Sequence, residues 1–144
     1  MGFKVEQIDH VHVYVRDRRE AARWYERVLG LSVVESHSDP EEGGPLVVSS
    51  DGGSTGLALF KRKPDAGRTS TTVAFRVGGS GFLEFINRLA SLKVEGEGGR
   101  TLAPSDVVDH DYCYSLYFND PDGNPYELTT YDYDDVRARL GRNV

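Results

Sequence analysis

Two histidines and a tyrosine alternate with valines near the start of the sequence. Residues 8–16 read Ile-Asp-His-Val-His-Val-Tyr-Val-Arg, so His10, His12 and Tyr14 fall on every second position. This alternation predicts a β-strand with one aliphatic face and one polar face. Two imidazoles on one strand face can bind a divalent metal, and a histidine can also act as a general base because it titrates near neutral pH. The alternative interpretation is that both are hydrogen-bonded polar residues lining a cavity.

The elements that would position these residues follow in a regular order. Apolar residues at helical spacing predict a helix that begins with Asp17 and Glu20 as a capping box and ends at Gly30. Three further strands are expected at 31–37, 45–50 and 56–62.

The second half of the sequence repeats this order. A helix capped by Ser80 is expected between strands, a short closing helix is expected at 132–140, and the Gly-rich segment 97–111 predicts no element. The strands are expected at 71–77, 93–96, 114–118 and 126–130. The sequence therefore predicts an α+β fold of two tandem βαβββ modules.

We expect one domain over residues 1–144. Its parts would be a first module at 7–62, a second module at 70–131, and a C-terminal helix and tail at 132–144. The linker between the modules is too short for them to act as independent domains.

The duplication relates four positions. With an offset of 62 residues, His10 at the start of the first module corresponds to Thr72 in the second. Glu127 lies on the last strand of the second module, and its counterpart in the first is Ala58. If the sheets curl around a cavity, these four positions meet at one centre.

Three blocks of the sequence occur in the order seen in a known family. They are Asp9 to Val11, Trp24 to Leu31, and Tyr117 to Leu128. Over residues 8–131 the chain resembles the vicinal oxygen chelate superfamily, which includes glyoxalase I, extradiol dioxygenases, fosfomycin-modifying thiol transferases and bleomycin-resistance proteins. The resemblance implies a cup-shaped mixed sheet around a central cavity. It does not specify the reaction, because one scaffold hosts unrelated activities.

The resemblance also implies a divalent metal, Fe, Mn, Ni or Zn, with His10 and Glu127 as ligands. Metal-dependent members usually have a second histidine where this sequence has Thr72, and glyoxalase I adds a glutamate near Ala58. A threonine hydroxyl is a poorer ligand than imidazole. His12 can supply the second imidazole of a site with two histidines and one carboxylate, or act as the general base beside the metal.

Three further side chains are weaker candidates. Tyr14 continues the face of the two histidines and would orient a bound oxyanion or pack at the cavity rim. His110 and Asp111 would act on a substrate if residues 97–113 fold over the cavity as a lid. The alternative for His110, as for His37, is a solvated histidine beside a loop.

Two functions follow from these alternatives. The first is a metal-dependent dioxygenase or lyase, in which the metal acts as a Lewis acid on two adjacent oxygens of a small substrate. The second is a metal-free binding protein similar to the bleomycin-resistance proteins, which Thr72 and Ala58 favour. Retention of both His10 and Glu127 favours the first. The resemblance further implies a homodimer, in which the partner chain could supply a missing ligand.

The composition of the chain excludes some classes of partner and predicts its location. Lys and Arg number 17 against 23 Asp and Glu, and this net charge of −6 argues against a nucleic-acid partner. Apolar runs such as 57–60 are far shorter than the roughly 20 residues of a membrane span. The N-terminal residues lack an apolar stretch of signal-peptide length. With Cys113 as its one cysteine the chain forms no intrachain disulfide, so we expect a cytoplasmic protein.

Overall fold

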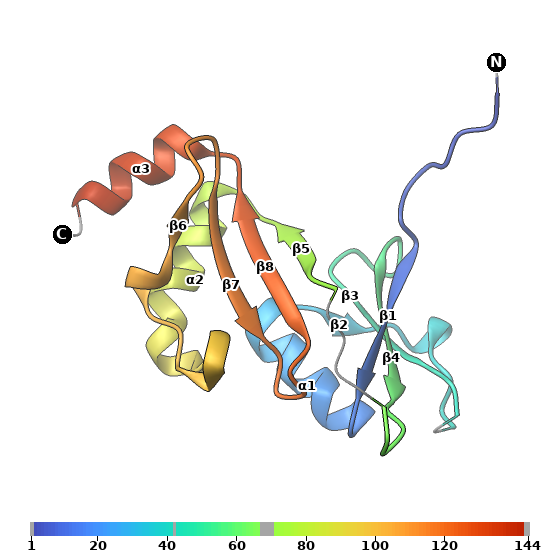
Figure 1. Ribbon diagram of the computed structural model, residues 1–144. Helices are drawn as coiled ribbons and strands as arrows, with labels where there is room; N and C mark the ends of the chain where they lie inside the picture. The colour runs from blue at the N-terminus through green and yellow to red at the C-terminus, as the bar shows by residue number, and fades with distance from the viewer. Residues whose placement is uncertain (1, 42, 67–70, 143–144) are drawn as a thin grey trace. The chain divides into compact units, whose positions relative to one another are not determined.

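The chain divides into two compact units, residues 1–67 (unit 1) and 68–144 (unit 2), and the computed structural model describes residues 2–41, 43–66 and 71–142 of them (Figure 1). Unit 1 consists of β1 His10–Val15, α1 Arg18–Leu29, β2 Ser32–Val33, the 3₁₀ helix η1 Glu35–His37, β3 Leu46–Ser49 and β4 Gly56–Lys61. Unit 2 consists of β5 Val73–Arg76, α2 Gly79–Leu92, the 3₁₀ helices η2 Glu97–Gly99 and η3 Pro104–Asp106, β6 Val108–Asp109, β7 Tyr114–Asn119, β8 Pro125–Thr130 and α3 Tyr133–Arg142. The α+β class and the repeated βαβββ order are as predicted.

Unit 1 has a four-stranded mixed sheet with the strand order β1-β4-β3-β2. β1 runs parallel to β4, and its register pairs His10 with Gly56 and His12 with Ala58. β3 runs antiparallel to β4 and pairs Val47 with Ala58. Residues paired across neighbouring strands share a face of the sheet. These five residues therefore lie on one face.

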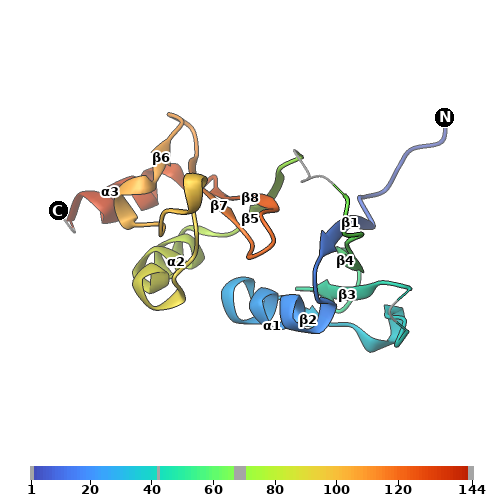
Figure 2. The ribbon, with the colours of Figure 1, turned by 60° about the horizontal axis from the view of Figure 1, so that its bottom comes forward.

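The opposite face of this sheet forms the core of unit 1 with α1 (Figure 2). Its buried side chains are Val13, Val15, Leu46, Val48, Leu57 and Leu59 from the strands and Ala21, Tyr25 and Val28 from the helix. The helix begins as predicted, because Oδ1 of Asp17 accepts a hydrogen bond of 2.9 Å from the backbone N–H of Glu20. It ends at Gly30, whose φ of +68° is accessible to glycine at little cost. Helix and core together fix β1, which carries the histidines on its other face.

Unit 2 repeats the arrangement with the strand order β5-β8-β7-β6. β5 runs parallel to β8, so that Ala74 pairs with Glu127, and β7 pairs Tyr117 with the same Glu127. The core on the other face contains Phe82, Phe85, Ile86 and Leu89 of α2, Leu116, Phe118, Tyr126 and Leu128 of the sheet, and Val136 of α3. Glu127 therefore lies on the face of the sheet opposite to this core.

Some boundaries differ from the predicted ones because tertiary contacts set them. The strand predicted at 31–37 ends at Val33, and the chain turns into η1 because Ser38 donates to the carbonyl of Val34 and accepts from the N–H of Val47. α2 begins at Gly79 rather than at a cap from Ser80, since Oδ2 of Asp132 accepts the N–H of Gly79 at 2.7 Å.

The segment 93–111 also differs from its prediction. In place of a strand at 93–96, the structure has single bridges from Glu95 to Thr101 and to Asn119. Residues 97–111 form η2, η3 and the short strand β6, which pairs with β7. Within the described part of the chain, no helix combines the length and the apolar character needed to cross a membrane.

Candidate functional site

β1 presents His10 and His12 next to each other on the exposed face of the unit 1 sheet. Their Nε2 atoms are 3.1 Å apart, and their rings stack with centroids 5.0 Å apart at an interplanar angle of 16°. Two imidazole nitrogens bound to one tetrahedral ion at about 2.0–2.1 Å each lie roughly 3.3 Å from each other. The distance of 3.1 Å between the two Nε2 atoms is close to this value and is also that of a hydrogen bond. Without an ion, one Nε2–H donates to the other Nε2.

Asp9 fixes the orientation of His10. Its Oδ2 lies 2.7 Å from Nδ1 of His10. A carboxylate only accepts, so the neutral ring carries its proton on Nδ1 and leaves a lone pair on Nε2. Metal-binding histidines commonly have this carboxylate partner, which also makes the ring more basic as a ligand. Sequence reasoning did not assign a role to Asp9, although its position directly before His10 was the available signal.

A cavity of about 380 Å³ opens on the same face of unit 1. It is lined by Asp9, His10, His37, Pro45, Val47, Gly53, Gly56 and Ala58. A Cβ atom at Gly53, which has a φ of +105°, would lie 2.6 Å from Cε1 of His37. The imidazole of His37 can reach the cavity wall because glycine occupies that position. His37 is thus part of a pocket, and not only a loop histidine.

Tyr14 lies farther along the same face, as the alternation predicts. Its ring stacks on Phe60 of β4 with centroids 5.9 Å apart, and Phe60 in turn lies 4.6 Å from the ring of His12. Tyr14 keeps 47% of its surface exposed, so it is not part of the core. The structure therefore brings His10, His12 and Tyr14 together on one exposed face.

Glu127 is half-buried on the face of the unit 2 sheet that faces away from α2. The hydroxyl of Ser115, which is fully buried, donates a hydrogen bond of 2.9 Å to Oε2 of Glu127. Thr129 lies 3.1 Å from the same hydroxyl. Partial burial, and then the charge of Glu127, raise the pKa of the neighbouring Tyr117 above its ordinary value. Glu127 is therefore a carboxylate held by a hydroxyl donor, with a protonated phenol beside it.

His110 lies against Tyr117 instead of projecting into solvent. Its Nε2 is 3.0 Å from the hydroxyl of Tyr117, and the rings meet edge to face at 85°. The backbone N–H of His110 donates to the carbonyl of Cys113, which holds the turn that carries it. His110 and Glu127 thus flank the same tyrosine, a contact that only the pairing of β6 with β7 creates.

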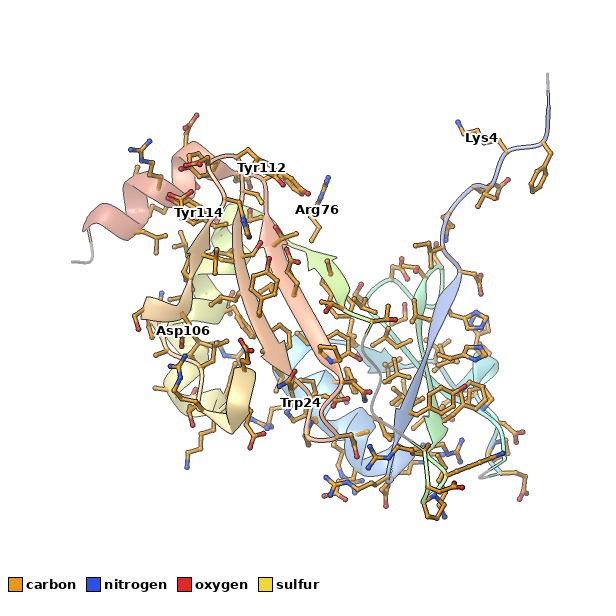
Figure 3. All side chains as sticks on the ribbon, in the orientation of Figure 1. Lys4, Trp24, Arg76, Asp106, Tyr112 and Tyr114 are labelled. Atoms are coloured by element: carbon orange, nitrogen blue, oxygen red, sulfur yellow. The ribbon has the colours of Figure 1, made fainter. Side chains whose placement is uncertain are left out.

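A second group of exposed rings lies at one end of the unit 2 sheet, where Figure 3 shows Arg76 and Tyr112. The guanidinium of Arg76 lies 4.4 Å from the ring centroid of Tyr131, and Tyr112 contacts the same ring at 6.3 Å. An arginine over an aromatic face is stabilised by cation–π attraction. This group belongs to unit 2.

The four positions related by the duplication differ in the side chains that they present. Ala58 lines the cavity next to His12, and Thr72 is exposed directly before β5. Over residues 2–41, 43–66 and 71–142, no three His, Cys, Asp or Glu side chains form a group that could hold a metal. The imidazole pair belongs to unit 1 and the carboxylate of Glu127 to unit 2.

The sequence of the chain matches that of a known family over most of its length. The family described as the Glyoxalase/Bleomycin resistance protein/Dioxygenase superfamily matches residues 7–128. No curated protein matches the chain.

Solved structures of similar fold include an oxidase and two fosfomycin resistance proteins. Oxidase ChaP-H1 is 26% identical, with 88% of this chain and 96% of that chain covered and a TM-score of 0.65. FosX from Mesorhizobium loti is 20% identical, with 95% and 99% covered and a TM-score of 0.63. A FosX variant from Listeria monocytogenes, in complex with Mn(II) and 1S,2S-dihydroxypropylphosphonic acid, is 17% identical, with 95% and 99% covered and a TM-score of 0.62.

Proposed function

We propose that this chain, which belongs to the Glyoxalase/Bleomycin resistance protein/Dioxygenase superfamily, binds a divalent metal through His10 and Glu127 and holds a small substrate there through two adjacent oxygens. The observation that carries the proposal is the arrangement of Asp9, His10 and His12. A carboxylate 2.7 Å from Nδ1 of His10 leaves a lone pair on Nε2, and the Nε2 of His12 lies 3.1 Å away. A relative of the same fold binds Mn(II), which supports a divalent ion of this kind.

The donor set fits a borderline transition metal such as Fe, Mn, Ni or Zn. Two imidazoles and one carboxylate form a set that such ions accept with coordination positions left open for substrate. Thr72 and Ala58 add no further protein ligand, which leaves more open positions than in a fully ligated site. When bound, the metal would stabilise negative charge on a substrate oxygen as a Lewis acid. The family includes dioxygenases and glyoxalases, and we propose an activity of one of these types.

His12 and Tyr14 are the proposed catalytic side chains. The spacing of 3.1 Å favours His12 as a second ligand, and its other proposed role is that of general base for a substrate hydroxyl. The hydroxyl of Tyr14, exposed on the same face, is proposed to contact the substrate. Metal retained by a His12→Gln variant that has lost turnover would assign His12 to proton transfer.

A metal-free binding protein of the bleomycin-resistance type is the second candidate. Thr72 and Ala58, at two positions where relatives can carry ligands, favour it, and so does the cavity of about 380 Å³. In this case His10 and His12 are polar residues of the cavity wall, and one Nε2–H donates to the other. We also propose a homodimer for either candidate, which light scattering on the purified chain would test.

Metal uptake by the 144-residue chain distinguishes the two candidates. Protein stripped with a chelator is titrated with Fe²⁺, Mn²⁺, Ni²⁺ or Zn²⁺, and the shift in melting temperature and the bound metal are measured, because a ligand of the native state raises its stability. We expect uptake by the unmodified chain and its loss in His10→Ala and in Glu127→Ala.

Two variants serve as matched controls. His37→Ala removes a histidine from the rim of the same cavity, and Glu84→Ala removes an exposed carboxylate from α2. Both should take up metal like the unmodified chain. If no metal shifts the melting temperature of the unmodified chain, the metal proposal is wrong and the binding function remains.

A further inference from the structure

Four rings form a continuous row on the exposed face of unit 1. Centroid distances are 5.0 Å from His10 to His12, 4.6 Å from His12 to Phe60, and 5.9 Å from Phe60 to Tyr14. The core of unit 1 lies on the other face of the sheet, so these rings do not serve to fill it. Aromatic side chains grouped on an accessible surface typically contact a ligand or a partner.

The cavity of unit 1 adjoins this ring row, because His10 belongs to both. Pro45, Val47 and Ala58 give the cavity an apolar part, and its volume of about 380 Å³ lies in the lower part of the range for small-molecule sites. Ala58 and the unsubstituted Gly56 leave space between the histidines of β1 and the strand β3. A Cβ at Gly56 would lie 2.6 Å from the carbonyl oxygen of Val48, so larger residues are excluded there.

Among the described residues, the cavity wall lacks the cationic side chains that usually recognise anionic ligands. Among the described residues that line it are one carboxylate, from Asp9, and the imidazoles of His10 and His37, but no lysine or arginine. Phosphonates and carboxylates are usually recognised by arginine or lysine through charge-assisted hydrogen bonds. The net charge of −6 acts in the same direction.

From the ring row, the apolar part of the cavity and the absence of cationic side chains in its described wall, we propose that this site takes an uncharged planar aromatic substrate. The aromatic plane lies against the ring of Phe60, between the rings of His12 and Tyr14, and the ring edge enters the cavity beside Pro45 and Val47. The inference rests on the proposed function in that the oxygens of such a substrate would reach the metal, but contact between the rings and the substrate does not require the metal.

Binding of 2-naphthol to the chelator-treated, 144-residue chain tests this inference. Calorimetry would give the Kd for 2-naphthol, for its saturated analogue decahydro-2-naphthol, and for propylphosphonate. The analogue keeps the hydroxyl and the carbon skeleton but has no aromatic face. We expect 2-naphthol to bind more tightly than both others. Equal binding of the saturated analogue, or tighter binding of propylphosphonate, would overturn the inference.

Two leucine variants locate the contact. Phe60→Leu removes a ring but keeps an apolar side chain, and should weaken 2-naphthol binding about 2- to 10-fold, as expected for one aromatic contact. The control Tyr112→Leu removes a ring of similar type, 67% exposed, from unit 2 and should leave the Kd unchanged. Equal effects of the two variants would contradict the proposed location. A Phe60→Leu variant that changes the oligomeric state but not the Kd for 2-naphthol would also contradict it. The ring row would then be an interface between copies of the chain.

Metal uptake and 2-naphthol binding test the two proposals separately. A chain that takes up metal but fails to prefer 2-naphthol refutes only the aromatic substrate. A chain that binds 2-naphthol through Phe60 but takes up no metal refutes only the metal site.

Discussion

Unit 1 and unit 2 place different side chains at the same register of the same strand arrangement. In unit 1 the row across β1, β4 and β3 is His12, Ala58 and Val47. In unit 2 the equivalent row across β5, β8 and β7 is Ala74, Glu127 and Tyr117. In this row each unit thus carries one reactive side chain on its pair of parallel strands, His12 or Glu127, with alanine as its neighbour.

This difference shows how a duplicated scaffold can divide chemistry between its copies. The alanine beside each reactive group leaves space around it, so neither His12 nor Glu127 is crowded by its strand partner. The groups that hold these side chains in place also differ between the two units. Unit 1 orients His10 with an adjacent carboxylate, whereas unit 2 holds Glu127 with a buried hydroxyl.

The two helices are capped in different ways as well. α1 is capped locally by Asp17, three residues before the N–H that it accepts. α2 has no local side-chain cap, and Asp132, which follows β8, accepts the N–H of Gly79 from 53 residues away. Unit 2 therefore ties the start of its helix to the end of its sheet.

The largest expected effect concerns the carboxylate that supports His10. Asp9→Asn removes the charge next to Nδ1 but keeps the size of the side chain. We expect metal affinity to fall on the order of 10- to 100-fold, the usual effect of losing such a partner. Calorimetric titration with Zn²⁺ measures it, with Asp65→Asn, an exposed aspartate of unit 1, as the control. Unchanged affinity would show that Asp9 does not support a ligand.

The second prediction reverses one difference between the units. Thr72→His gives unit 2 the imidazole that unit 1 has at the corresponding position. If Thr72 replaces a ligand, metal affinity should rise by about tenfold or more. Even residues that only hydrogen-bond to a metal ligand change metal affinity by about this much. Thr71→His, one residue away, provides the control. Affinity that is no higher for Thr72→His than for Thr71→His would contradict the correspondence of Thr72 with His10.

The third prediction concerns the hydroxyl that supports Glu127. Ser115→Ala should lower the free energy of unfolding by about 1.5 kcal/mol, since it removes a buried hydroxyl that donates to a half-buried carboxylate. Urea unfolding measures this change. Ser91→Ala, whose exposed hydroxyl donates to the carbonyl of Arg88 within α2, should change stability far less. Equal small losses in both variants would show that Ser115 does not support Glu127.

The smallest effects belong to the helix caps. Asp132→Ala should cost about 1 kcal/mol of stability, as expected for a lost cap, and should speed hydrogen exchange of the Gly79 amide. Asp17→Ala should speed exchange only at the start of α1. The N–H of Glu20 lowers the pKa of Asp17, so this cap acts at neutral pH and is lost as pH falls through that lowered pKa. Faster exchange at both helix starts in either variant would contradict the separate capping.

The repeated elements and the exposed face of β1 could be predicted because they depend on local patterns. Alternation of valines with His10, His12 and Tyr14 identifies a strand face without any tertiary information. By contrast, His37 reaches the cavity only because Gly53, distant in sequence, lacks a side chain. His110 lies on Tyr117 only because the two-residue strand β6 pairs with β7, and a strand that short has no periodic signal. Contacts of this kind arise from tertiary structure.

The central claim is that the chain binds a divalent metal, and the metal content of the purified protein tests it most directly. Elemental analysis after loading with Fe²⁺, Mn²⁺, Ni²⁺ or Zn²⁺ and removal of unbound ion should give close to one metal per chain, with none in Glu127→Ala. A content near zero in the unmodified chain with all four ions would contradict the claim.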